Sequence, residues 1–192
     1  IDLKSNTRMF RLLQGDVGSG KTILALIAAA NVLEDNFQVA FMAPTEILAK
    51  QHYELAIDLF KTTNINIGLI TSKIVGAEKN KIINNLSNGN IKLLFGTHSL
   101  FQKKINFLNL GFVIIDEQHK FGVNQRIKLA RKGGDNCDVL TMSATPIPRT
   151  MMLSFFGDMD ISVLDEKPKY RKEIITLIKP ENKLKEIIPL IK

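Results

Sequence analysis

The chain has 192 residues, of which 45% are hydrophobic and 23% are charged, so it can bury a sizeable core and intrinsic disorder is excluded. Its longest uninterrupted apolar run, Ile23–Ala30, has eight residues, whereas a membrane-spanning helix needs about 20. Its single cysteine, Cys137, excludes an internal disulfide framework and a multi-cysteine zinc site.

Short apolar runs alternate with longer helical patterns along the chain. The runs expected to be strands are Arg11–Gly15, Val39–Ala43, Ile67–Ile70, Lys92–Phe95, Phe112–Asp116 and Val139–Met142. The segments expected to be helices are 21–34, 46–60, 76–87 and 124–131, the third of them ending near Gly89. Several strands are apolar at consecutive positions, which is typical of strands buried on both faces of a parallel sheet. The pattern predicts an α/β domain with a mostly parallel sheet and helices on both faces.

The pattern weakens beyond residue 160, where a further strand over 173–178 and the start of a helix over 182–192 are expected. Residues 167–192 carry eight basic and three acidic side chains, a net +5 of the chain's formal charge of +7. We expect a domain over 1–165 and a basic linker over 166–192. Because the main body is nearly balanced, charge alone favours DNA binding no more than a solvated lysine-rich surface. The lone cysteine and the lack of a signal-peptide pattern fit a cytoplasmic protein without a membrane partner.

A glycine-rich run follows the first predicted strand. It reads Gly15, Asp16, Val17, Gly18, Ser19, Gly20, Lys21 and Thr22. This matches the phosphate-binding pattern G-x-x-x-x-G-K-[ST], with a strand before it and an apolar helix after it. The glycines let the backbone curl so that successive N–H groups face one anion. Lys21 would reach the β- and γ-phosphates of ATP, and the Thr22 hydroxyl would ligate Mg²⁺. The alternative is a glycine-rich turn whose lysine faces solvent.

An acidic motif ends the buried-strand pattern of residues 112–115. It reads Asp116, Glu117, Gln118 and His119. Two carboxylates at the end of an apolar strand would be costly if they were simply buried, and a divalent cation removes that cost. Asp116 would hold Mg²⁺ through its water shell, and Glu117 would orient and deprotonate the attacking water. A solvated turn is the alternative, and it is frequent for a lone Asp-Glu pair.

Three further stretches lie at strand ends. Ser143 and Thr145 are small hydroxyl residues that could bond the acidic motif and relay the state of the nucleotide. Pro44 with Thr45, and Gly96 with Thr97, could present hydroxyls and backbone N–H groups to a sugar-phosphate backbone. Read in isolation, the first is a turn and the others are plain helix caps.

Taken together and in this order, these stretches resemble the superfamily 2 helicases. The glycine-rich run corresponds to motif I, Ala43–Ala49 to motif Ia, Gly96–Leu100 to motif Ib, Asp116–His119 to motif II and Ser143–Thr145 to motif III. The resemblance covers about residues 3 to 180. Within the superfamily, the runs 11–22, 42–49, 116–123 and 144–150 look like the bacterial helicases that remodel branched DNA. Lys120 departs from the arginine expected after His119.

The resemblance implies a RecA-like P-loop NTPase domain that serves as the first motor lobe of an ATP-dependent DNA helicase. Such a motor remodels stalled forks and Holliday junctions in recombination and repair. The implied catalytic residues are Lys21, Asp116 and Glu117, the implied coupling residues are Gln118, His119, Ser143 and Thr145, and the implied DNA contacts are Pro44, Thr45, Gly96, Thr97 and Arg149.

The same resemblance implies domains that no segment of this sequence matches. These are a wedge domain that grips the junction and a second RecA-like domain that carries an arginine finger. Such a finger contributes roughly 10³ to 10⁵ in rate. We therefore expect this chain alone to bind ATP weakly and to hydrolyse it poorly.

Three alternatives stay open at the level of sequence. One is the motor lobe of a transcription-repair coupling factor, which shares several of these runs, although Gln118 and the run 45–48 favour the branched-DNA helicases. Another is a P-loop NTPase outside the helicases, such as a small-molecule kinase or a transport ATPase. A non-catalytic DNA-binding module is the third.

Overall fold

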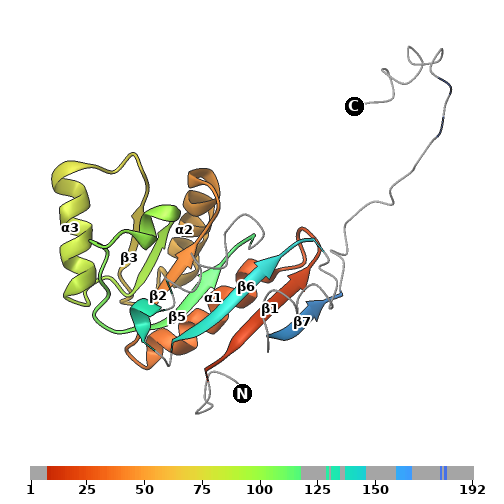
Figure 1. The fold of residues 1–192 in the computed structure, drawn as a ribbon, viewed down its shortest axis with the longest axis horizontal. Coiled ribbons are helices and arrows are strands. Elements are labelled where there is room, and N and C mark those ends of the chain that lie inside the picture. Colours follow the sequence, from red (N-terminus) through yellow and green to blue (C-terminus); the bar gives the residue numbers. More distant parts are fainter. Residues whose placement is uncertain are drawn as a thin grey trace.

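A parallel sheet forms the centre of the molecule (Figure 1). The computed structural model describes residues 8–117, 129, 131–134, 137–145, 159–165, 178 and 180. In chain order the strands are β1 (Phe10–Gly15), β2 (Gln38–Met42), β3 (Ile67–Ile70), β4 (Leu93–Gly96), β5 (Leu110–Ile115), β6 (Asp138–Ser143) and β7 (Asp160–Leu164). They form a seven-stranded sheet in the order β3-β4-β2-β5-β6-β1-β7, and every pairing in it is parallel.

The predicted helices flank the sheet on both faces. They are α1 (Lys21–Glu34), α2 (Glu46–Phe60) and α3 (Gly76–Ser87), with the short 3-10 helices η2 (His98–Phe101) and η4 (Arg131–Gly133) between later strands. One core joins α1 and α2 to alternate residues of the central strands, such as Phe41, Phe95 and Phe112. A second core joins α3 and η2 to the intervening residues, such as Met42 and Val113. The prediction of an α/β domain with helices on both faces is therefore confirmed.

Local chemistry explains the helix boundaries, which agree with the three predicted segments. Thr45 caps the N-terminus of α2, because its side-chain oxygen accepts a hydrogen bond from the Leu48 N–H at 3.2 Å. Gly89 follows α3 with φ +74°, a left-handed conformation that glycine adopts without strain. Most of the predicted helix over 124–131 lies outside the described residues, and so do nearly all of 173–178 and 182–192. The boundary expected between residues 165 and 166 stays a prediction.

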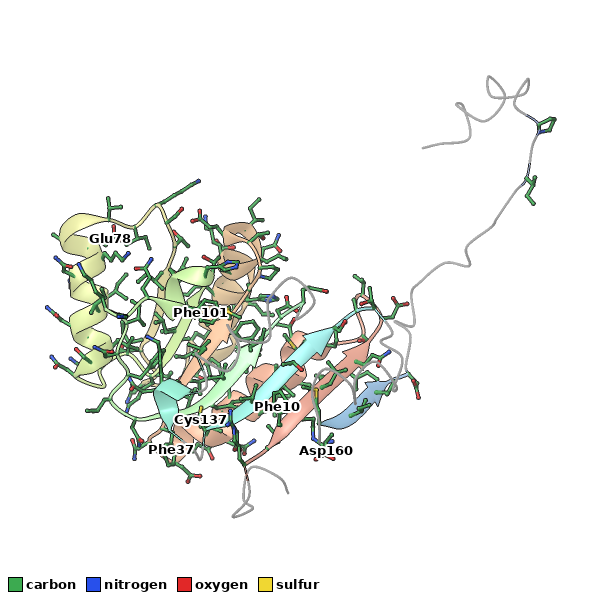
Figure 2. The ribbon with its side chains drawn as sticks, in the orientation of Figure 1. Phe10, Phe37, Glu78, Phe101, Cys137 and Asp160 are labelled. Atoms are coloured by element: carbon green, nitrogen blue, oxygen red, sulfur yellow. The ribbon has the colours of Figure 1, made fainter. Side chains whose placement is uncertain are left out.

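The sequence did not predict β7, which pairs with β1 at one edge of the sheet. No position of β7 is fully buried, so it lacks the continuous apolar run of a central strand. The side chain of Arg11 holds it in register: one guanidinium nitrogen donates to the Ser162 hydroxyl at 2.8 Å, and another lies 3.3 Å from the Asp160 carboxylate. Figure 2 shows Asp160 at the start of this strand.

No described helix is both long enough and apolar enough to cross a bilayer. This agrees with the short apolar runs in the sequence.

A buried glutamine connects three parts of the fold. The side chain of Gln38, which is 1% exposed, donates to the carbonyls of Leu86 and Ile91 at 2.8 and 2.7 Å. Its amide oxygen accepts from the Asn109 N–H at 2.9 Å. One side chain therefore satisfies three backbone groups between α3, β4 and β5.

We predict that Gln38→Leu lowers the free energy of unfolding by about 3 kcal/mol, because an apolar side chain leaves the Ile91 carbonyl and the Asn109 N–H without this partner. The Leu86 carbonyl keeps the hydrogen bond that it accepts from the Gly89 N–H at 3.0 Å. Urea denaturation measures the change. The control is Gln51→Leu at an exposed position of α2, for which we expect a change within about 0.5 kcal/mol. Equal stabilities for the two variants would contradict the proposed role of Gln38.

Candidate functional site

The candidate residues gather at one edge of the sheet. Because all strands are parallel, their carboxyl ends lie at the same edge, where ligands bind in open α/β sheets. Strand β6 lies between β1 and β5, with Gln14 beside Ser143 and Ile115 beside Thr141. The glycine-rich run, the acidic motif and the Ser143–Thr145 turn therefore follow three adjacent strands.

The glycine-rich loop, residues 15–22, has the curled backbone that its sequence predicts. Gly18 and Gly20 have φ +82° and +91°, in the left-handed region. A Cβ on Gly15 would lie 2.6 Å from the Ser19 hydroxyl oxygen, so the loop closes too tightly for a side chain there. That hydroxyl is buried and has no hydrogen-bond partner among the described residues. A loop with backbone N–H groups, a helix N-terminus and an unsatisfied hydroxyl fits a phosphate group.

Lys21, the first residue of α1, is buried, with only 9% of its surface exposed. Its ammonium nitrogen donates to the carbonyl oxygens of Gly15 and Asp16 at 2.7 and 2.8 Å. The lysine therefore reaches back across the loop, and the solvent-facing alternative is wrong. Since an ammonium group has three hydrogens, these two bonds leave a third donor for an anion.

A cleft of about 280 Å³ opens beside the loop. Its lining residues are Gln14, Gly15, Asp16, Ala144, Val163, Leu164 and Asp165. It therefore joins the ends of β1, β6 and β7. The contribution of β7 could not be found from the sequence, because the strand itself was not predicted.

Asp116 lies at the end of β5 and is almost fully buried, with 8% of its surface exposed. Its backbone N–H donates to the Met42 carbonyl at 2.8 Å, which ties it to β2. One of its carboxylate oxygens lies 2.9 Å from Nε2 of His52, a residue of α2. Sequence reasoning missed His52, because a single histidine within a helical pattern does not indicate which residue its side chain contacts.

Glu117, the next residue, has a strained backbone. Its φ of +51° is in the left-handed region, which costs a residue with a Cβ about 1–3 kcal/mol. The other described non-glycine residue in this region is Asn36, a residue type that tolerates it. Strain of this kind clusters at functional sites.

The hydroxyls of the third motif bond each other. The Ser143 Oγ lies 3.1 Å from the Thr145 Oγ1, and the Thr145 N–H donates to Ser143 Oγ at 3.3 Å. Ser143 is fully buried at the end of β6. The contact of these hydroxyls with the acidic motif, which the sequence suggested, stays a prediction. Gln118, His119 and Arg149 lie outside the described residues.

The candidate DNA residues follow two adjacent strands, β2 and β4, where the Ala43 N–H donates to the Gly96 carbonyl at 2.9 Å. Thr45 is exposed but caps α2, and Pro44 and Thr97 are half-buried. Gly96 is buried, and a Cβ there would lie 2.9 Å from the Ile70 carbonyl. Close packing against β3 therefore explains why residue 96 is a glycine.

Glu46 connects this edge to the loop after β3. Its carboxylate accepts hydrogen bonds from both the hydroxyl and the backbone N–H of Ser72, the latter at 2.7 Å. These bonds, the hydroxyl first, hold the pKa of Glu46 below its ordinary value, with a further contribution from the charge of Lys73.

Cys137 takes no part in this edge. It precedes β6, at the opposite end of the strand (Figure 2), and is fully buried. Burial raises the pKa of its thiol to about 12, which excludes it as a nucleophile at neutral pH.

The fold and the loop together define a P-loop NTPase domain, and comparison with known proteins gives the family. Residues 3–153 match the family described as DEAD/DEAH box helicase. The chain belongs to this family. That membership excludes the alternative of a P-loop NTPase outside the helicases, such as a small-molecule kinase or a transport ATPase.

The chain is similar over nearly its whole length to proteins named ATP-dependent DNA helicase RecG. The protein of Thermotoga maritima is 49% identical over 191 residues, which are 100% of this chain and 24% of that protein. The protein of Bacillus subtilis is 47% identical over 190 residues, which are 99% of this chain and 28% of that protein. These relatives confirm the resemblance to bacterial ATP-dependent DNA helicases.

Solved structures agree with this relationship. A structure of RecG bound to a three-way DNA junction matches 99% of this chain and 25% of its own length, with a TM-score of 0.84 and 44% identity. The helicase MrfA bound to DNA matches 82% of this chain and 25% of its own, with a TM-score of 0.62 and 15% identity, which shows the fold alone. The chain spans about a quarter of the length of the RecG relatives.

We predict that Ser72→Ala raises the pKa of Glu46 toward its ordinary value, because the variant loses the hydroxyl donor and keeps the backbone N–H. A carbon-detected NMR titration of the Glu46 carboxyl group measures the change. Ser87→Ala, at the end of α3, is the control and should leave this titration unchanged. If Glu46 titrates identically in wild type and Ser72→Ala, the hydroxyl does not hold the carboxylate.

Proposed function

We propose that this chain is the ATP-binding motor lobe of a superfamily 2 DNA helicase that remodels branched DNA in recombination and repair. The observation that carries the proposal is the glycine-rich loop, with buried Lys21 inside it, at the same sheet edge as Asp116 and Glu117. The RecG relatives and the RecG structure bound to a three-way DNA junction support the choice of substrate. They favour the motor lobe of a branched-DNA helicase over that of a transcription-repair coupling factor.

In this proposal the loop binds the phosphates of ATP. The backbone N–H groups of residues 15–22 and the N-terminus of α1 provide donors and partial positive charge. Lys21 adds a full charge that neutralises charge developing on the transferred phosphoryl group. Its third N–H lets it contact a phosphate without giving up both loop carbonyls.

Mg²⁺ fits the acidic side of the site. Among the described residues, no three His, Cys, Asp or Glu side chains cluster closely enough to hold a metal by themselves. Mg²⁺ suits such a site, because it keeps several waters and is bound by one or two protein oxygens together with substrate phosphates. Thr22 and Asp116 are the proposed ligands. Bound there, the ion supplies charge that stabilises the phosphates.

Glu117 is the proposed base. It follows Asp116 directly. Its left-handed backbone gives its side chain a different direction from the one that an extended backbone would give. In this role it orients the attacking water and removes its proton.

The DNA and the rest of the motor are the proposed partners. Pro44, Thr45, Gly96, Thr97 and Arg149 are the proposed contacts to single-stranded, double-stranded or branched DNA, and Gln118, His119, Ser143 and Thr145 the proposed coupling residues. A wedge domain and a second RecA-like domain complete the motor that the resemblance implies. On that basis the present chain hydrolyses ATP poorly by itself.

We predict that Lys21→Ala lowers the affinity for Mg-ATP by at least about 100-fold, because it removes charge-assisted hydrogen bonds worth about 1.5–3 kcal/mol each. Isothermal titration calorimetry measures the affinity, and circular dichroism checks the fold. Lys50→Ala, an exposed lysine of α2, is the control. Unchanged affinity in Lys21→Ala would refute the site assignment.

A further inference from the structure

His52 is the described partner of the Asp116 side chain. The Nε2 atom lies 2.9 Å from one carboxylate oxygen, and the two side chains are only 12% and 11% exposed. An ionised carboxylate only accepts hydrogen bonds, so the donor is the Nε2–H of His52. At this depth the bond is poorly screened by water.

The imidazole is held in place by packing as well as by this bond. Its ring centroid lies 4.9 Å from that of Phe41, at an interplanar angle of 41°. Phe41 is fully buried in β2 and stacks in turn on Phe95 of β4 at 4.9 Å. The ring therefore rests on the core, and its donor has a fixed direction.

Asp116 is held both by its backbone and by its side chain. Its backbone is bonded to Met42, the residue after Phe41, and its side chain to a ring that packs on Phe41. Helix α2 and strand β2 thus determine the direction of a carboxylate that belongs to β5. His52 contacts one of the two carboxylate oxygens, and the bonds among the described residues leave the other oxygen to a different ligand.

We propose that His52 is a positioning residue that holds Asp116 in the orientation needed for the nucleotide-bound metal ion. This inference rests on the proposed function, because it assumes that Asp116 serves as a metal ligand. His52 itself touches neither metal nor nucleotide. Residues that orient a metal ligand from behind typically contribute 10–100-fold to metal affinity or activity.

The experiment separates the N–H donor from the packing of the ring. His52→Phe keeps an aromatic ring against Phe41 and removes the donor, whereas His52→Gln keeps a donor and removes the ring. The affinity for a fluorescent ADP analogue is measured on the whole 192-residue chain, once with saturating Mg²⁺ and once with EDTA. Mn²⁺ binding, followed by electron paramagnetic resonance with the nucleotide present, reports on the metal directly.

We expect His52→Phe to weaken Mn²⁺ binding by about 10–100-fold and to abolish most of the gain in nucleotide affinity that Mg²⁺ gives. Its affinity in EDTA should stay at the wild-type value. His52→Gln should recover most of the metal dependence. Gln51→Ala, an exposed neighbour on α2, serves as the control and should behave as wild type.

Three results would overturn the inference while the proposed function stands. In one, Lys21→Ala loses nucleotide binding but His52→Phe keeps the full Mg²⁺ dependence. In the second, His52→Phe weakens nucleotide binding equally with Mg²⁺ and with EDTA, and in the third, His52→Gln fails to recover the Mg²⁺ dependence. Either of these two results indicates a purely structural role. If wild type and Lys21→Ala bind nucleotide with the same affinity, the proposed function itself is refuted. Should His52→Phe not fold, His52→Leu replaces it in each comparison.

Discussion

The parallel pairing of every strand determines where the chemistry of this chain lies. Residues separated by about a hundred positions, such as Lys21 and Asp116, follow strands that end at one edge. Strand β6 between β1 and β5 adds the Ser143–Thr145 turn to the same place. If a strand ran the other way, its loop would lie at the opposite edge. The site therefore depends on the direction and order of the strands before it depends on any single side chain.

Two charged side chains are buried at this edge, and each has partners that offset the cost of leaving water. Lys21 bonds two carbonyls of its own loop, and Asp116 bonds His52. Each contact fixes the direction of its charged group within the described residues.

Helix α2 connects two parts of the proposed motor. Its N-cap, Thr45, is one of the proposed DNA contacts, and its second turn carries His52 against Asp116. Since a helix moves largely as a unit, a displacement at its start also displaces the imidazole. The proposed DNA contacts and the proposed metal site would therefore share one helix.

Residues with a strong local pattern were predictable from the sequence. The continuous apolar runs gave six strands, the 3.6-residue period gave α1, α2 and α3, and the glycine spacing gave the loop. Strand β7 was missed because an exposed edge strand has no such run, and its register depends on Arg11 from a distant part of the chain. His52 was missed for a related reason, since its role exists only once α2 packs over the end of β5. The hydroxyls of Ser143 and Thr145 were identified, but their mutual bonding depends on the turn geometry.

We propose that the glycine-rich loop and the acidic motif form one nucleotide site. The most direct measurement is an NMR map of backbone amide shifts as Mg²⁺ and a nonhydrolysable ATP analogue are added to the 192-residue chain. We expect the largest shifts on residues 15–22, on Asp116 and Glu117, and on Ala144 in the cleft. Large shifts confined to other regions, with the loop and Asp116 unchanged, would contradict it.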